Sequence, residues 1–376
     1  MSAGSPSRRR RSRARPYPRP TPRGRELSGR DEPAGPPPRH STRRTWLTRC
    51  GLLVLTAAAV AYVVPRLLVE TRRSWSSAGA AVEVLLVLAL VAELASSGCF
   101  SALSRVLLPS AARPPYPVML AIDVTGNGFS HVVPGGGAAA AALRFRLLAR
   151  VGVPPSDAVG AAALESAISV LWLAAALVIG LVAAVPAPET HPFLKTALVL
   201  AVVSMTTFGG LVAVLAVRPD LVVTVTAAIA DRLPLVQQAG LERLVRAVLL
   251  QVRLVVGNRS RRTRAVLWGL GNWTCDALAL YLCVWAFGDP PSVGALLTTY
   301  ALVSLIALLP LTPGGLGLVE GVAVPVLLSF GTGQEAALLG VLAWRLFAFW
   351  LPIPLAGGAY LWLRRGTAGA PAGGPS

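Results

Sequence analysis

The sequence has little charge and almost no lysine. Charged residues make up 14% of the 376 residues and hydrophobic residues 54%, and Lys195 is the single lysine among 35 basic residues. Soluble domains carry roughly 25% charged residues, so this composition excludes an ordinary soluble domain. The preference for arginine, with abundant Ala, Gly and Pro, is typical of a GC-rich bacterial genome. We therefore expect a bacterial membrane protein.

Residues that carry catalytic or metal chemistry are also scarce. The chain has four cysteines and three histidines, without a Cys-x-x-Cys pair or a Cys/His spacing typical of a zinc site. It has no G-x-S-x-G, no H-E-x-x-H and no P-loop, because its triple glycine is not followed by Lys-Ser or Lys-Thr. We predict neither an enzyme nor a protein with a cofactor, a metal ion or a disulfide framework.

Long apolar runs dominate what is present. Ser166–Val185 and Ala197–Val217 contain no charged residue, and a helix of ~20 apolar residues crosses the ~30 Å hydrocarbon layer of a membrane. The pattern predicts an all-α polytopic membrane protein. Its six full spans are predicted at 46–68, 79–104, 156–185, 192–217, 264–287 and 335–363.

Two segments hold most of the net charge of +18. Residues 1–45 carry 13 arginines and three acidic residues, and residues 218–264 carry nine arginines and three acidic residues. Neither segment interleaves aromatic residues with the arginines or resembles a nucleic-acid-binding fold, so we exclude a nucleic-acid partner. Arginine-rich flanks are typical of the cytoplasmic side of a membrane, where they contact anionic headgroups.

The arginines also predict an orientation. The tail 1–45, the loop 218–264 and Arg364-Arg365 are basic, so we expect them in the cytoplasm. The connectors 186–192 and 288–292 lack lysine and arginine, so we expect them outside. Both termini are then cytoplasmic, in a multi-pass protein of the bacterial inner membrane.

The same features divide the chain into regions. Residues 1–45 and 366–376 are low-complexity tails that we expect to be disordered, and residues 46–365 form the membrane domain. In the 218–264 loop, Leu241–Val256 places Leu and Val at helical spacing beside arginines. This pattern predicts an amphipathic helix on the inner headgroups.

Two further apolar segments are interrupted by glycine and proline. Tyr116–Arg150 contains GNGFSHVVPGGG, and Ser292–Gly331 contains PLTPGGLG. Each segment is long enough to enter the membrane and return, so we predict two re-entrant helical hairpins with bends at these motifs. The first hairpin is bracketed by arginines and is expected to enter from the cytoplasm. The second is not, and is expected to enter from outside.

The two hairpins match each other at an offset of 179 residues. The matched positions are Pro134 with Pro313, Gly135 with Gly314, Gly136 with Gly315, and Gly152 with Gly331. A long predicted span follows each hairpin. Two related units of opposite orientation form an inverted repeat, an arrangement that in transporters places broken helices and the substrate site near the midplane of the membrane.

The Pro-Gly-Gly motif at each bend is suited to binding an anion. Proline fits the first helical turn because its missing N–H would be unpaired there, and glycines let a headgroup approach the backbone. A helix N-terminus carries roughly half a positive charge, which favours phosphate or carboxylate. The alternative is a kink, or close helix packing through small residues.

Ionisable residues at membrane depth provide further candidates, because each costs at least ~2.5–3.5 kcal/mol without a partner. The candidates are Glu83, Glu93, Asp123, His131, Arg144, Arg146, Glu165, Asp276, Glu320 and Arg345. Our hypothesis is that Arg345, together with Arg144 or Arg146, binds a lipid phosphate while Glu165 and Glu320 hold the arginines in place. The alternative is Glu–Arg salt bridges that only stabilise the helix bundle.

Three other polar residues are expected to support this site. Asn127 precedes the first bend, and Asn272 and Asp276 share one helical face at i and i+4. Asp276 fits an interhelical contact or a cavity wall equally well. Asp123 and His131 lie on either side of Asn127, and the sequence assigns them no role.

The second half of the chain resembles a known family. PLTPGGLGLVEGVAVPVLLSFG (310–331) and AWRLFAFWLPIPLAGGAYLW (343–362) are similar to the signature of the flippase-like membrane domain of lysylphosphatidylglycerol synthases and its stand-alone relatives. NGFSHVVPGGGAAAAALRFRLLARVGV (127–153) resembles the first block of that family. The chain departs from the family where three glycines and a run of alanines follow Pro134, so that an expected charged pair is missing, and where Ser166 follows Glu165 in place of an arginine.

The resemblance implies a membrane domain that binds or translocates a polar-headed phospholipid or a lipid-linked sugar. The chain ends eleven residues after Arg365, so we expect no synthase domain and no aminoacyltransferase activity. One alternative is a non-transporting scaffold for a membrane glycosyltransferase or a lipid-modifying enzyme. A small-solute transporter is the other.

Overall fold

The computed structural model describes residues 78–133, 136–184, 238–307, 315 and 317–368, with six single helical positions between 196 and 210. All of these residues belong to one compact unit, Val54–Ser376. The predicted span 46–68, the tail 1–45 and nearly all of the predicted span 192–217 lie outside the described residues.

Every regular element in the described residues is helical. In chain order these elements are α2 (Ala78–Leu107), η1 (Ser110–Ala112), α3 (Tyr116–Val132), α4 (Gly136–Arg150), α5 (Pro155–Ala184), α8 (Gln238–Val256), α9 (Arg259–Ala286), α10 (Val293–Ala307), α11 (Leu318–Ser329), α12 (Gln334–Arg345), the π-helical turn η3 (Leu346–Trp350) and α13 (Pro352–Ala368).

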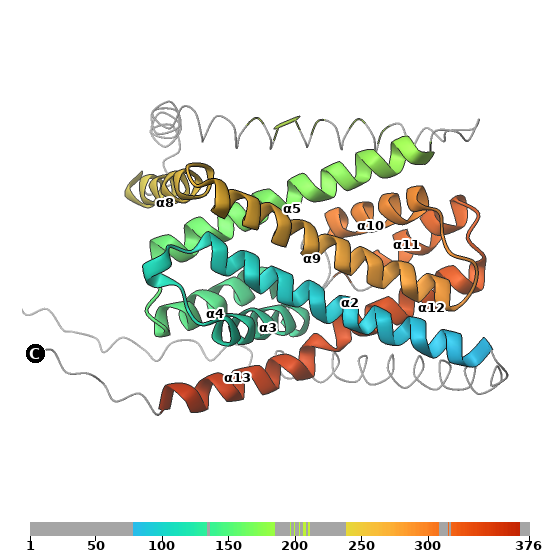
Figure 1. Cartoon of the computed structure of the whole chain (residues 1–376), viewed down its shortest axis with the longest axis horizontal. Helices are drawn as coiled ribbons and strands as arrows, with labels where there is room; N and C mark the ends of the chain where they lie inside the picture. The colour runs from blue at the N-terminus through green and yellow to red at the C-terminus, as the bar shows by residue number, and fades with distance from the viewer. Residues whose placement is uncertain are drawn as a thin grey trace, which may run out of the picture. The chain divides into compact units, whose positions relative to one another are not determined.

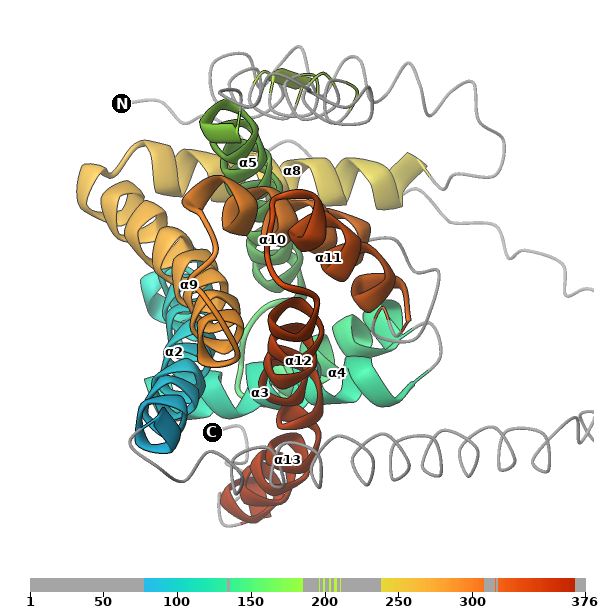
Figure 2. The same cartoon turned by 90° about the vertical axis from the view of Figure 1, so that its right-hand side faces the viewer.

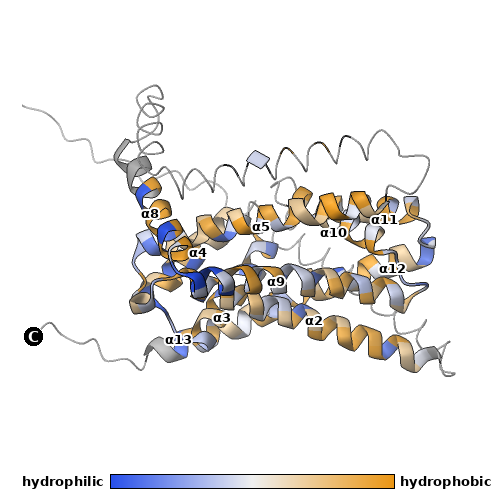
Figure 3. Cartoon of the chain, turned by 45° about the horizontal axis from the view of Figure 1, so that its top comes forward, coloured by the Kyte–Doolittle hydropathy of each residue, from blue (hydrophilic) through white to orange (hydrophobic). Residues whose placement is uncertain are grey.

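Three described helical stretches are long and apolar enough to cross a membrane. They are Gly79–Leu107, Pro155–Ala183 and Gln334–Arg365, and they coincide with three of the predicted spans. The third is interrupted by η3, directly after Arg345. α9 covers a fourth predicted span and has Asn272 and Asp276 near its middle. In Figure 3 the hydrophobic colour dominates α5, α10 and α11.

Each predicted hairpin consists of two short helices. α3 and α4 pack together in the first, and α10 and α11 pack together in the second. The α4 helix begins at Gly136, whereas Pro134 and Gly135 lie outside the described residues, as do Pro313 and Gly314 in the second bend. Gly315 is buried and has a φ of +70°, a conformation that glycine adopts without steric cost.

The helices before and within each hairpin pack against helices from the other half of the chain. α2, which precedes the first hairpin, runs along α9, which precedes the second (Figures 1 and 2). α3, from the first hairpin, packs against α13, and α10, from the second hairpin, packs against α5. Each hairpin therefore opens with a helix that packs on the long helical segment following the other hairpin.

The turns that end the two hairpins have the same geometry. Gly152 and Gly331 both have a φ of +84°. The amide after each glycine donates to the carbonyl five residues earlier, over 3.0 Å from Val153 to Leu148 and 3.1 Å from Thr332 to Leu327. This is the Schellman ending, in which a left-handed glycine closes a helix. The glycines, the donor residues and the acceptor residues of the two turns are each 179 positions apart in the sequence.

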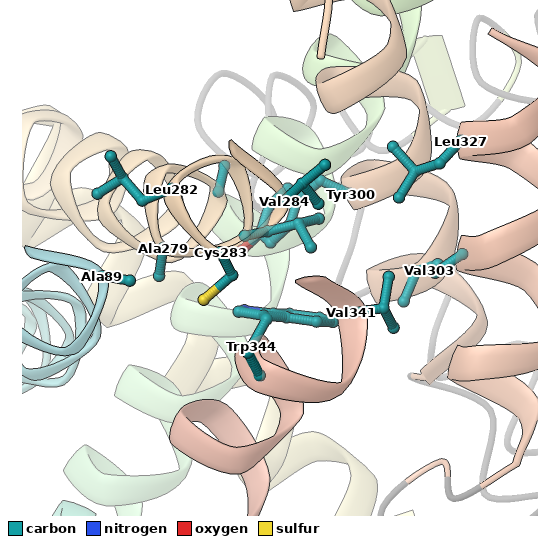
Figure 4. Close-up of a cluster of buried hydrophobic side chains, with 14 of the residues drawn as sticks. Ala89, Ala279, Leu282, Cys283, Val284, Tyr300, Val303, Leu327, Val341 and Trp344 are labelled. Atoms are coloured by element: carbon teal, nitrogen blue, oxygen red, sulfur yellow. The ribbon is translucent and has the colours of Figure 1, made fainter. Parts of the chain in front are cut away.

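A buried apolar cluster joins α9, α10, α11 and α12. Cys283 and Val284 on α9, Tyr300 on α10, and Val341 and Trp344 on α12 are among its members. Figure 4 shows Trp344 beneath Cys283 and beside Val341. This packing fixes the position of Arg345, the residue after Trp344.

Two glycines allow the closest helix contacts. A Cβ atom added to Gly128 on α3 would overlap the carbonyl oxygen of Pro352 and approach the Cβ atom of Ala356 on α13 to 2.5 Å. A Cβ atom added to Gly340 on α12 would lie 2.5 Å from the Cα atom of Val284 on α9. Both helix pairs therefore need glycine at the crossing.

We predict that Gly128→Ala lowers the thermal unfolding midpoint of the protein in detergent. Overpacking costs about 1–3 kcal/mol, which exceeds the gain of about 1 kcal/mol for alanine over glycine in a helix. Gly137→Ala is the control, because an added Cβ atom there meets nothing within 4 Å. Equal midpoints for the two variants would contradict this packing.

Candidate functional site

The first polar cluster surrounds Arg144 on α4. Its Nε atom lies 2.8 Å from Oδ1 of Asp123 on α3. Its two terminal nitrogens donate to both carboxylate oxygens of Glu165 on α5, at 2.7 and 2.9 Å, and one of them also donates to the Ser104 hydroxyl of α2 at 2.8 Å. Four helices thus meet at one guanidinium.

The two carboxylates reach Arg144 because of the hairpin. Asp123 and Glu165 each lie 21 residues from Arg144 along the chain, one before the bend and one after the Gly152 turn. Both carboxylates are buried, with exposed fractions of 5%. The bidentate geometry with Glu165 is the strongest arrangement for a guanidinium and a carboxylate, and it offsets the cost of burying these charges.

The second polar cluster surrounds Arg345 at the end of α12. Its Nε atom lies 2.8 Å from Oε1 of Glu320 on α11. The other Glu320 oxygen accepts a hydrogen bond of 2.8 Å from the backbone N–H of Gly317, which caps α11. Glu320 therefore both caps its own helix and pairs with the following one.

Aromatic contacts connect this cluster to the first hairpin. The Arg345 guanidinium lies 4.5 Å from the ring centroid of Phe349 in η3, within the range of a cation–π interaction. On α3, His131 stacks on the same ring at 4.5 Å, and its Nδ1 lies 3.0 Å from the Phe349 carbonyl oxygen. π-Helical turns such as η3 are rare and are frequent at functional sites.

The two clusters contain corresponding ion pairs, but the positions of the arginine and the glutamate are exchanged. In the first half of the chain, the second hairpin helix carries Arg144 and the long helix after it carries Glu165. In the second half, the second hairpin helix carries Glu320 and the long segment after it carries Arg345. In both halves, an ion pair joins a hairpin to the helix that follows it.

Asp276 on α9 joins the second cluster to the core. Its carboxylate accepts hydrogen bonds from the Tyr300 hydroxyl at 2.8 Å and from the Trp344 indole N–H at 2.9 Å. Its charge also interacts with Arg345 and with Glu93 of α2. One turn earlier on α9, Asn272 accepts a hydrogen bond of 3.2 Å from Ser96. The face shared by Asn272 and Asp276 is therefore an interhelical contact.

A cavity of about 490 Å³ lies between α2, α3, η3 and α13. Most of its lining is apolar, and its polar side chains are Glu93, Ser97 and Asn127. Glu93 is 8% exposed, and its Oε2 atom has no hydrogen-bond partner among the described residues. Leu355 and Trp362, which also line the cavity, are exposed on the outer surface, so the cavity opens toward the surroundings of the helices.

The structure places the predicted charged residues in two separate clusters, one around Arg144 and one around Arg345. Arg144 pairs with Glu165, Arg345 pairs with Glu320, and Asn127 lines the cavity. Arg146 stays apart, because its side chain is exposed on α4. Of the six bend residues predicted to bind the headgroup, Gly136 and Gly315 lie within the described part of the chain, and Pro134, Gly135, Pro313 and Gly314 lie outside it.

Sequence reasoning did not assign several residues that complete the clusters. They are Ser104, Asp123, Tyr300, Trp344, Phe349 and Glu93. Charge at membrane depth pointed to Asp123 and Glu93 without a role for either. The hydroxyl and aromatic side chains gave no signal, because they are common in membrane helices.

Comparison with known proteins agrees with this architecture. The family model described as the lysylphosphatidylglycerol synthase TM region matches residues 48–356. The chain belongs to this family. The match covers both hairpins and both ion pairs, and it makes the protein a membrane protein with apolar spanning helices.

Two relatives are UPF0104 membrane proteins of Methanothermobacter thermautotrophicus. One is 35% identical over 83 residues, which cover 22% of this chain and 24% of the relative. The other is 27% identical over 115 residues, which cover 30% of this chain and 34% of the relative. The alignments thus span about a quarter and a third of these relatives' lengths.

The described residues show no metal-binding arrangement, since no group of three or more His, Cys, Asp or Glu side chains among them could hold an ion. The side chains of the two clusters interact through hydrogen bonds and ion pairs. Such a site can bind and orient a polar group in apolar surroundings.

We predict that Arg144→Gln lowers the free energy of unfolding of the protein by about 3–5 kcal/mol, because it leaves two buried carboxylates without a cation. Arg146→Gln removes the same charge two residues later on the exposed side of α4 and should change stability by less than about 0.5 kcal/mol. Unfolding by SDS titration from mixed micelles measures both. Similar values for the two variants would refute the pairing.

Proposed function

We propose that this protein is a flippase-like membrane protein that binds a polar-headed lipid and moves its headgroup between the two leaflets. The observation that carries the proposal is the apolar cavity between α2, α3 and α13, with Glu93 on its wall. A surface-open apolar cavity with one buried acid suits a molecule that has a long tail and a polar head.

The size of the cavity supports partial enclosure of such a lipid. Ligand pockets typically measure about 300–1,000 Å³, and a cavity of about 490 Å³ holds a headgroup and the start of a chain. The exposed Leu355 and Trp362 continue the apolar surface outward. The remaining part of the tail can then stay in the membrane while the head is bound.

The chemistry of the cavity favours a headgroup with hydrogen-bond donors. Arg144 already uses four of its N–H groups on Asp123, Glu165 and Ser104, and a guanidinium has five. The acidic side chain on the cavity wall is Glu93, beside Asp276. Two neighbouring carboxyl groups in apolar surroundings are stabilised by a donor or a positive charge.

Sugar hydroxyls or an amine therefore fit the cavity better than phosphate alone. The candidates are a lipid-linked sugar or an aminoacylated phospholipid, and the second agrees with membership in the family of the lysylphosphatidylglycerol synthase TM region. In this proposal the pairs Arg144–Glu165 and Arg345–Glu320 hold the helices around the headgroup path, and the glycines of the two bends line it.

We further propose six full spans and two re-entrant hairpins arranged as an inverted repeat. Three features support this: the identical turns at Gly152 and Gly331, the exchange of helix contacts between the hairpins, and the reversed ion pairs. In this proposal both termini lie in the cytoplasm of a bacterial cell, which the positive charge of the basic segments favours. The chain acts without catalysis, and partners include anionic lipids and a membrane glycosyltransferase or lipid-modifying enzyme.

The test is lipid exchange in proteoliposomes with a matched pair of variants. Gly358 lines the cavity and Gly357 does not, and an added Cβ atom meets nothing within 4 Å at either position. Gly358→Leu should fill the cavity and slow the exposure of labelled headgroups severalfold, whereas Gly357→Leu should leave the rate unchanged. Thermal unfolding of both variants checks that they fold equally.

The lipid panel separates the alternatives. It contains phosphatidylglycerol, lysylphosphatidylglycerol and a polyprenyl-phosphate sugar. If the unchanged protein exchanges none of these lipids, the result would contradict the flippase proposal and favour the alternative of a non-transporting scaffold protein. Stabilisation by water-soluble headgroups as strong as that by whole lipids would favour a small-solute transporter.

A further inference from the structure

Four arginines gather at one end of the α2–α9 pair. Arg105 lies in the last turn of α2, Arg113 follows η1, and Arg261 and Arg264 lie in the first turns of α9. The charges of the other three act on Arg113. In Figure 3 this end of α9 is among the most hydrophilic parts of the helices.

None of the four forms an ion pair with a carboxylate in the described part of the chain. The hydrogen bonds made by this group go to neutral acceptors. Arg105 donates to the Pro114 carbonyl at 2.8 Å, and Arg113 donates to the Leu108 carbonyl at 3.1 Å. Arg264 donates to Ser260 in its own helix. The positive charge of the cluster is therefore not balanced by these contacts.

The cluster also contains two buried N–H donors. The Nε atom of Arg113 and one terminal nitrogen of Arg261 are buried and have no hydrogen-bond partner among the described residues. Burial lowers the pKa of the Arg113 guanidinium, and the charges of Arg261, Arg105 and Arg264 lower it further. The buried donors and the adjacent like charges both cost free energy.

We infer that the α2–α9 junction is a binding site for a phosphate-type anion, formed by Arg105, Arg113, Arg261 and Arg264. Planar guanidinium groups match the oxygens of a phosphate. The N-terminus of α9 adds its partial positive charge to the same place. The anion is the phosphodiester of a membrane lipid or free phosphate, and both present the same oxygens.

This site is separate from the cavity of the proposed function. None of the four arginines lines that cavity, and Arg105 and Arg113 lie outside the 218–264 segment in which the sequence showed its internal excess of arginine. A lipid held here would fix the junction of α2 and α9, the two helices that precede the hairpins, without being moved itself.

The test measures binding of three probes to the full chain in detergent. They are phosphatidylglycerol, a diacylglycerol with the same chains, and inorganic phosphate, each followed by native mass spectrometry and thermal unfolding. We expect phosphatidylglycerol to bind and diacylglycerol not to bind at this site. Binding of inorganic phosphate as tightly as the lipid would assign the site to free phosphate, and weaker phosphate binding would assign it to the lipid.

Two double variants with equal loss of charge locate the site. Arg113→Gln/Arg261→Gln should weaken phosphatidylglycerol binding by about tenfold or more, from the loss of charge-assisted hydrogen bonds. Arg259→Gln/Arg262→Gln changes two exposed arginines in the first turns of α9 and should weaken binding less than about twofold, since neither is among the arginines whose charges act on Arg113. Equal weakening by the two double variants would overturn the inference.

A single exposed variant keeps the inference testable if the first double variant does not fold. Arg264→Gln should weaken binding more than Arg262→Gln does, and equal effects would again overturn the inference. Gly358→Leu should leave this binding intact whatever its effect on lipid exchange. Failure of the anion site and failure of the flippase proposal are therefore distinguishable.

Discussion

Burial of charge in apolar helices is the constraint on which this structure depends. A guanidinium buried among apolar helices must find acceptors, and Arg144 finds them on α2, α3 and α5. That requirement holds the first hairpin against the long helix after it. Arg345 and Glu320 do the same in the second half of the chain with the charges reversed. Since the bilayer offers no hydrogen bonds to replace these, the pairs act as fixed points around which the apolar surfaces pack.

The close helix contacts depend on small side chains where two helices cross. Without a strong hydrophobic force between helices in lipid, packing depends on small residues that let backbones approach. Gly128 serves the α3–α13 crossing and Gly340 the α9–α12 crossing. The exchange of partners between the hairpins then encloses the polar clusters and leaves one apolar cavity beside Glu93. In the proposed function this cavity receives the lipid, while the ion pairs hold the surrounding helices in position.

Much of the fold was predictable, because proline, glycine and long apolar runs have local consequences. The hairpins and the turns at Gly152 and Gly331 follow from such signals. The partners of the arginines were harder to predict from the sequence, since Arg144 contacts Asp123 and Glu165 only after the chain has folded back. Nothing in the sequence separates Glu93, which is buried on the cavity wall, from Glu83, which is exposed on the same helix. That difference depends on which face of α2 packs on α3 and α9.

An experimental structure of the protein in lipid nanodiscs, with an aminoacylated phospholipid or a lipid-linked sugar present, tests the central claim most directly. The account predicts headgroup density within hydrogen-bond distance of Glu93, with the tail leaving the cavity past Leu355 and Trp362. A cavity filled by protein side chains, or lipid density that never approaches Glu93, would contradict it.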